Sequence, residues 1–207
     1  MPRVATRVFG QQSQSRPIDQ GIKRTLDWRQ EWAKQAVIVI AASLLVAVCA
    51  RVTVPLPFTP VPLTLQNFGV LTVGLLLGSR RGFAALALYL IEGALGMPVF
   101  SPAILGSGVS HLFGVTGGFL MAYPLVAFVA GRIYENTSRR FGWAALAAVV
   151  GELVLFAGGL SWLAILTHSV SMAIRYGLYW FVFAEVIKVM MAAGVASRWH
   201  RQPSTRG

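Results

Sequence analysis

Four ionisable side chains interrupt the long apolar segments of this chain, and they are its first candidates for a binding site: Glu92, Glu152, Glu185 and Lys188. A charge at the centre of a bilayer costs about 2.5–3.5 kcal/mol on insertion scales, so such groups usually face a cavity and a partner. Glu185 and Lys188 are three residues apart, which places them on one face of a helix. There they offer a carboxylate and an ammonium group, either to a polar ligand or to each other as an ion pair that joins two helices.

The other two carboxyl groups have simpler explanations. Glu92 lies near the outer end of its apolar segment. It either lines the same cavity as Glu185 or extends to the membrane surface, and we expect the second. Glu152 lies midway along its segment, and we expect its carboxyl group to hydrogen-bond to the backbone of a neighbouring helix.

Catalytic signatures are absent from the sequence: it has no phosphate-binding P-loop, no GxSxG nucleophile motif and no HExxH. The histidines, at positions 111, 168 and 200, are isolated and do not have the spacing of metal ligands. The single cysteine, Cys49, excludes an internal disulfide and a cysteine-based zinc site. We therefore expect neither an enzyme nor a resident metal or cofactor.

The composition predicts that this chain is embedded in a lipid membrane. Of its 207 residues, 56 % are hydrophobic and only 12 % are charged, whereas soluble domains carry about 25 % charge. A soluble globule with so few charges would expose large apolar patches and aggregate. The same figures exclude a disordered chain.

Six apolar segments predict an all-α integral membrane protein with six transmembrane helices: residues 33–50, 62–78, 83–97, 114–133, 143–166 and 177–196. A spanning helix needs about 20 apolar residues, and the second and third segments reach this only with their flanking residues. The alternative is that these two form one re-entrant hairpin, which leaves four spans. The proline-rich connection 51–65 is expected to be a stiff, extended loop.

The basic residues predict the orientation. Fifteen of the 18 Lys and Arg fall in the N-terminal region, the second and fourth connections and the C-terminus, all on one side of a six-helix path. This positive-inside pattern places both termini in the cytoplasm and explains the net charge of +11 without a nucleic-acid partner. The expected organisation is a basic tail (1–33, with a short interfacial helix over about 18–32), a six-helix domain (34–199) and a basic tail (200–207).

Two runs of small residues have more than one interpretation. Residues 114–119 (GVTGGF) open the fourth apolar segment, where glycines admit either a ligand or a closely packed helix. Ser43 and Ala47 are four residues apart on the first segment, and such a groove suits the docking of another helix.

The order of these motifs resembles the BioY family, the biotin-binding S components of energy-coupling-factor transporters. The resemblance runs from Ala41 to Ala196 through five stretches: 57–66 (PFTPVPLTLQ), 74–82 (GLLLGSRRG), 88–100 (LYLIEGALGMPVF), 114–118 (GVTGG) and 177–188, which ends in Glu185-x-x-Lys188. It implies a membrane-embedded subunit in a prokaryotic cell membrane that captures biotin from the outer face. It further implies a transmembrane coupling subunit and ATPase subunits as partners, and it gives the Ser43/Ala47 groove a use.

In the resemblance, Glu185 and Lys188 match the residues that contact biotin, with glutamate in place of the usual aspartate. That substitution, and the lack of a family asparagine after residue 100, keep an S component for a different small vitamin as the alternative. Biotin offers ureido N–H donors and a carbonyl, an apolar ring and chain, and a carboxylate that requires a cation or helix N-terminus. The expected ligand-binding residues are Glu185, Lys188, Trp162, Phe100, Ser101, Thr116, Gly117, Arg175 and Glu92, and the expected docking pair is Ser43 and Ala47.

Overall fold

The computed structural model describes residues 17–104, 106 and 108–200, and these residues are mostly helical. The chain divides into two compact units, Met1–Ala36 and Val37–Gly207. Helix α1 (Pro17–Arg51) is continuous through the boundary, so the region expected as a tail is helical from Pro17 onward. The expected C-terminal tail, apart from residue 200, lies outside the described residues.

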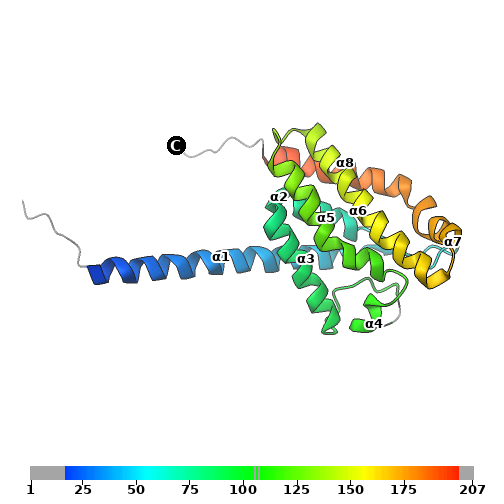
Figure 1. The fold of residues 1–207 in the computed structure, drawn as a ribbon, viewed down its shortest axis with the longest axis horizontal. Helices are drawn as coiled ribbons and strands as arrows, with labels where there is room; N and C mark the ends of the chain where they lie inside the picture. Colours follow the sequence, from blue (N-terminus) through cyan, green and yellow to red (C-terminus); the bar gives the residue numbers. More distant parts are fainter. Residues whose placement is uncertain (1–16, 105, 107, 201–207) are drawn as a thin grey trace, which may run out of the picture. The chain divides into compact units, whose positions relative to one another are not determined.

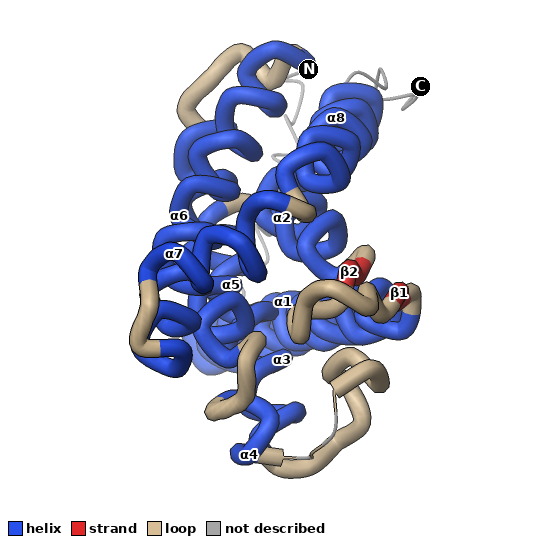
Figure 2. Tube along the Cα trace, turned by 90° about the vertical axis from the view of Figure 1, so that its right-hand side faces the viewer, coloured by secondary structure: helices blue, strands red, loops and turns tan. Residues whose placement is uncertain are grey.

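The second unit is a bundle of helices with one short hairpin (Figures 1 and 2). After α1, its elements in chain order are β1 (Thr53–Val54), β2 (Leu63–Thr64), α2 (Gln66–Leu77), α3 (Ser79–Ala94), α4 (Val109–Leu112), α5 (Gly117–Glu135), α6 (Phe141–Thr167), α7 (Val170–Ile174), the π-helix η1 (Arg175–Tyr179) and α8 (Val182–Trp199).

Within the part of the chain that the structure describes, three helical stretches are long and apolar enough to cross a membrane: Trp28–Arg51, Gly117–Glu135 and Phe141–Thr167. A fourth arises if Val170–Tyr179 and Val182–Trp199, which bend by 47° at a short break, form one span. The second and third apolar segments form α2 and α3, which have 12 and 16 residues and are shorter than a typical spanning helix. The mostly helical fold with three or four candidate membrane spans is therefore confirmed, and the total of six spans stays a prediction.

Large apolar side chains on the outside of the bundle agree with a lipid environment. Leu153 and Ile165 on α6 and Phe183 on α8 are 65 %, 64 % and 79 % exposed. The interior packs through small residues instead, and alanines of α5 and α6 such as Ala127, Ala130 and Ala147 are fully buried. Small side chains let helix backbones approach closely, which is how membrane helices gain packing energy in the absence of water.

Gly78 sets the turn between α2 and α3. Its φ is +82°, in the region that favours glycine, and a Cβ there would lie 1.9 Å from a carboxylate oxygen of Glu135. That carboxylate accepts hydrogen bonds from the Ser79 backbone N–H (2.9 Å) and hydroxyl (2.8 Å). The end of α5 therefore satisfies a free donor in the first turn of α3 and fixes where these helices meet.

The proline-rich connection is not helical over residues 52–65, as expected, and its ends pair as a short hairpin that the sequence did not predict. Thr53 pairs with Thr64 and Val54 with Leu63 in a two-residue antiparallel ladder, so the prolines lie in the loop of a hairpin. The tip of the hairpin packs on the region before α8. The Thr59 hydroxyl donates to the Tyr176 carbonyl (2.7 Å), and the Phe58 and Trp180 rings lie 4.3 Å apart.

The close contact between α5 and α6 predicts a stability effect. A Cβ at Gly118 would lie 2.2 Å from the Trp162 Cβ and 2.6 Å from the Gly158 carbonyl oxygen. Overpacking of this kind costs about 1–3 kcal/mol. We expect Gly118→Ala to lower the midpoint of thermal unfolding, measured on detergent-solubilised protein, by several degrees.

Gly194 on α8 supplies the matched control, since a Cβ there meets nothing within 4 Å. Gly194→Ala should leave the midpoint unchanged or raise it, because alanine favours the helix. Equal losses in the two variants would contradict the close α5–α6 contact.

Candidate functional site

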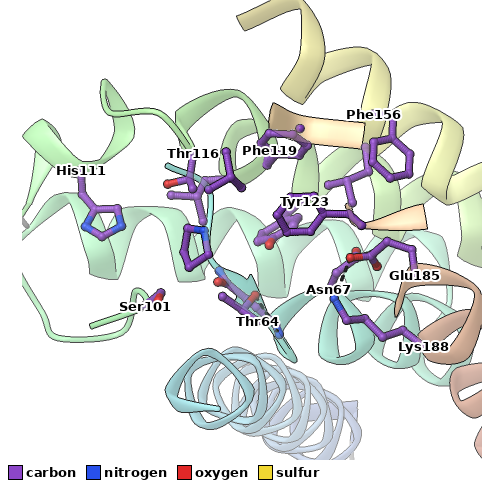
Figure 3. Close-up of a pocket in the computed structure, with 17 residues that line it drawn as sticks. Thr64, Asn67, Ser101, His111, Thr116, Phe119, Tyr123, Phe156, Glu185 and Lys188 are labelled. Atoms are coloured by element: carbon purple, nitrogen blue, oxygen red, sulfur yellow. Dashed lines mark hydrogen bonds and ion pairs between the residues drawn. The ribbon is translucent and has the colours of Figure 1, made fainter. Parts of the chain in front are cut away.

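A narrow cavity lies between α2, α5, α6 and α8, and the hairpin and the segment after α3 also border it (Figure 3). Its volume is about 60 Å³. The lining residues are Val61, Pro62, Thr64, Gln66, Asn67, Ser101, His111, Thr116, Phe119, Leu120, Tyr123, Leu155, Phe156, Gly177, Phe181, Glu185 and Lys188. Polar groups gather at its two ends, with aromatic rings between them (Figure 3).

The first polar end is a cluster of Asn67, Glu152, Glu185 and Lys188, from α2, α6 and α8, all buried. The Lys188 ammonium donates to one oxygen of Glu185 at 2.6 Å, and the Asn67 amide donates to the other at 2.8 Å. The same amide nitrogen also donates to Glu152. The two carboxyl groups thus share the Asn67 amide, and Lys188 pairs with Glu185 alone. This ion pair on α8 faces the cavity (Figure 3).

Several polar atoms in this region have no partner. Among the described residues, the buried side-chain atoms without a hydrogen bond are Asn67 Oδ1, Thr72 Oγ1, Thr116 Oγ1 and Glu152 Oε2. Asn67 and Thr116 line the cavity, and Glu152 belongs to the cluster at its end. A buried polar group left unpaired costs about 1–3 kcal/mol, so these atoms are available to a polar ligand.

The middle of the cavity is apolar. The side chains of Phe119 and Tyr123 lie between the polar ends, and Phe156 lies toward the Glu185 end (Figure 3). Pro62 and Leu155 add aliphatic surface. This stretch suits a ring or chain without polar atoms.

The second polar end holds Ser101, Thr64 and His111 (Figure 3). The Ser101 hydroxyl lies 3.0 Å from the Thr53 hydroxyl, and the His111 ring packs 4.9 Å from the Phe100 ring. Burial lowers the pKa of His111, so the ring is neutral at pH 7. A second hollow shares Ser101 and His111 with the cavity and is lined by Arg51, which brings a cation to this end.

Four of the residues expected from the sequence line the cavity, namely Glu185, Lys188, Ser101 and Thr116. The expected hydrogen bond from Glu152 to a helix backbone is wrong, because its carboxyl group accepts from the Asn67 side chain instead.

The other five expected ligand residues do not line the cavity. The Trp162 ring N–H donates to the Gly114 carbonyl at 2.9 Å, and Phe100 packs edge-on against Tyr89. Gly117 is buried at the start of α5, where it serves helix packing. Arg175, in η1, is exposed.

Glu92 also differs from its expected course to the membrane surface. It is partly buried, and the Ser43 hydroxyl of α1 donates to its carboxylate. Ser43 is fully buried, and Ala47 is partly buried against the core. Ser43 therefore faces the bundle and Ala47 keeps some exposed surface, and the docking role of this pair stays a prediction.

Sequence reasoning missed Asn67, Phe119, Tyr123 and His111 as members of the site. The available signal for Asn67 was an amide side chain at the start of an apolar segment, which is as unusual as the carboxyl groups. The two aromatic residues had no signal, since aromatic residues are common throughout these helices.

Comparisons with known proteins agree with the motifs. The family model described as the BioY family matches residues 19–205. A probable biotin transporter BioY of Pyrococcus horikoshii is 36 % identical over 166 residues, which cover 80 % of this chain and 96 % of the relative. The biotin transporter BioY of Thermotoga maritima is 38 % identical over 154 residues, 74 % of this chain and 88 % of the relative.

A solved structure supports the fold. The crystal structure of the S-component for biotin from an ECF-type ABC transporter superposes with a TM-score of 0.75 at 21 % identity, covering 84 % of this chain and 94 % of that one. Together with the family match over nearly the whole chain, these findings show that the chain belongs to the BioY family.

Proposed function

We propose that this protein is the biotin-binding S component of an energy-coupling-factor importer. Its named relatives are biotin transporters, and its family is one of transporters rather than enzymes. The observation that carries the proposal is the cavity itself, in which a buried cluster around Glu185 and Lys188 closes one end of an aromatic chamber. The protein does no covalent chemistry in this function; it captures the vitamin and releases it inward.

The cavity suggests how biotin lies in it. The ureido N–H groups meet the carboxyl groups of the cluster, and the ureido carbonyl accepts from Lys188 or Asn67. The sulfur-containing ring and its chain lie among Phe119, Tyr123 and Phe156. The carboxylate then points to the end with His111 and Arg51. This assignment replaces Arg175, which lines neither the cavity nor the adjoining hollow that contains Arg51.

The chamber must widen for this ligand. Its volume of about 60 Å³ has room for about four water molecules, less than biotin occupies. The hydrogen bond from Thr59 to Tyr176 and the contact between the tilted Phe58 and Trp180 rings hold the hairpin tip against the helix region before α8. Separation of these contacts enlarges the chamber without breaking the core between α5 and α6.

The wider assembly follows from the same proposal. Six membrane-crossing helices with both termini in the cytoplasm agree with the positions of the basic connections. In this arrangement α2 and α3 each cross the membrane once, and their flanking loops complete the length of each crossing. The chain has no P-loop, so uptake takes its energy from ATPase subunits joined through a transmembrane coupling subunit. The host membrane is a prokaryotic cell membrane, as in the organisms of the named relatives.

An S component for a different vitamin is not favoured, since the relatives are named for biotin. A competition assay with labelled biotin separates the two. Unlabelled biotin should displace the label more effectively than any other vitamin of similar size. A tighter competitor would replace biotin as the ligand.

The cluster around Lys188 gives the first binding prediction. A hydrogen bond to a charged group contributes about 1.5–3 kcal/mol, so its loss weakens binding by about 10- to 100-fold. We expect Glu185→Gln and Lys188→Met each to weaken biotin binding to the solubilised protein by at least about tenfold, measured by calorimetry or by equilibrium binding of labelled biotin.

The double variant Glu185→Gln/Lys188→Met guards against misfolding, because it removes both members of the ion pair and leaves neither without its partner. Glu92→Gln is the control, since that carboxyl group lies outside the cavity. If the folded double variant binds biotin as tightly as the wild type, the site lies elsewhere.

The position of Arg51 gives the second binding prediction. We expect Arg51→Gln to weaken the binding of biotin by about tenfold and to leave the binding of biotin methyl ester unchanged, because the ester carries no charge for the guanidinium group. Arg175→Gln, the matched control, should change neither affinity, since Arg175 lines neither the cavity nor the adjoining hollow that Arg51 lines. Equal weakening of acid and ester would show that Arg51 acts on the fold and does not recognise the carboxylate.

A further inference from the structure

A third hollow, of about 560 Å³, lies at the end of the bundle opposite Ser101 and His111, where α3 begins and α5 and α8 end. Four arginines line it, and they come from two different parts of the chain: Arg80, Arg81, Arg132 and Arg139. Leucines at the end of α2, from Leu75 to Leu77, form an apolar part of the wall. The proposed biotin site does not use this hollow.

The hollow carries an excess of positive charge. Among the described residues, the four arginines form no ion pair with a carboxylate. Glu135, also in the wall, uses its carboxylate oxygens on the backbone and hydroxyl of Ser79. The Arg139 guanidinium lies 3.2 Å from the His200 ring nitrogen Nδ1. Burial, followed by the charge of Arg139, lowers the pKa of His200, so the ring is neutral at pH 7 and Nδ1 accepts from the guanidinium.

Guanidinium groups are suited to one class of ligand. Their planar set of N–H donors matches the oxygens of a phosphate, and several around one hollow can hold it from different sides. Basic pockets between membrane helices at the cytoplasmic surface bind anionic lipid headgroups. The neighbouring leucines add an apolar surface to this hollow. The acyl chains of a phospholipid can cover that surface, whereas a free phosphate ion cannot.

We propose that this arginine hollow binds the phosphate of an anionic phospholipid in the leaflet at that end of the bundle. A bound headgroup joins the start of α3 to the end of α5 and the connection after it, because its phosphate is shared among arginines from these segments. The lipid thereby stabilises the bundle end opposite the Ser101 and His111 end of the binding cavity. The site is independent of which vitamin that cavity takes.

The test compares two double variants of equal charge. Arg132→Gln/Arg139→Gln removes two arginines from the hollow, and Arg140→Gln/Arg198→Gln removes two that do not line it. The purified, full-length proteins in detergent receive phosphatidylglycerol, phosphatidylcholine or inorganic phosphate. Native mass spectrometry counts the bound lipid, and the midpoint of thermal unfolding reports stabilisation.

Phosphatidylglycerol should bind to the wild type and raise its midpoint by several degrees, and phosphatidylcholine should do neither. The Arg140/Arg198 variant should respond as the wild type does, and the Arg132/Arg139 variant should lose at least two thirds of the response. Equal loss in both double variants would reduce the effect to overall charge and overturn the site. An equal rise with inorganic phosphate would make a soluble anion the ligand.

The alternative occupant of the arginine hollow is a protein partner. Co-purification of coupling and ATPase subunits with each variant tests it. Loss of the subunits from the Arg132/Arg139 variant, with unchanged phosphatidylglycerol binding, would overturn the lipid proposal in favour of a docking surface. The biotin affinity of the folded Arg132/Arg139 variant should equal that of the wild type, so failure of this inference and failure of the proposed function are distinguishable.

Discussion

The ion pair between Glu185 and Lys188 constrains much of the bundle interior, because a charged group away from water must find partners within the protein. The pair alone leaves the second Glu185 oxygen unsatisfied, and Asn67 of α2 supplies that hydrogen bond. The same amide nitrogen reaches Glu152 of α6. Three helices are thereby held around one set of polar groups, and the cavity is the space that opens beside them.

This arrangement leaves a few polar atoms of the cluster open to a ligand. The cluster is satisfied within the protein except for a few atoms, such as Asn67 Oδ1 and Glu152 Oε2. A ligand with N–H or O–H donors can hydrogen-bond to these open oxygen atoms. When the ligand leaves, Glu185 and Lys188 still have each other as partners. The aromatic middle of the chamber supplies apolar contacts that need no fixed partner.

The two ends of the bundle have different constructions. At the arginine end, Glu135 caps the start of α3, and Gly78 allows the tight turn that this contact requires. At the other end, a proline-rich hairpin and the segment after α3 border the cavity through a few contacts, including Thr59 with Tyr176. The first end is fixed by charge-assisted hydrogen bonds, whereas the second is held by a few contacts between the hairpin tip and the helix region before α8.

Much of this protein could be predicted from sequence because the relevant signals are local. Composition identified the lipid environment, and the three-residue spacing of Glu185 and Lys188 placed both on one helix face, as the structure shows. The basic connections were expected at one end, and Arg80, Arg81, Arg132 and Arg139 do line one hollow there. The family motifs added the ligand class.

Tertiary structure alone decided which distant residues meet. Asn67 joins Glu185 across 118 positions of the chain, and Glu92 turns to Ser43 across 49. Trp162 and Phe100 were plausible ligand contacts by residue type, yet each packs against a neighbouring helix or loop instead. Helical periodicity assigns a side chain to a face, but the rotation and tilt of each helix determine what that face meets. Those depend on close packing over the whole bundle, which no local pattern records.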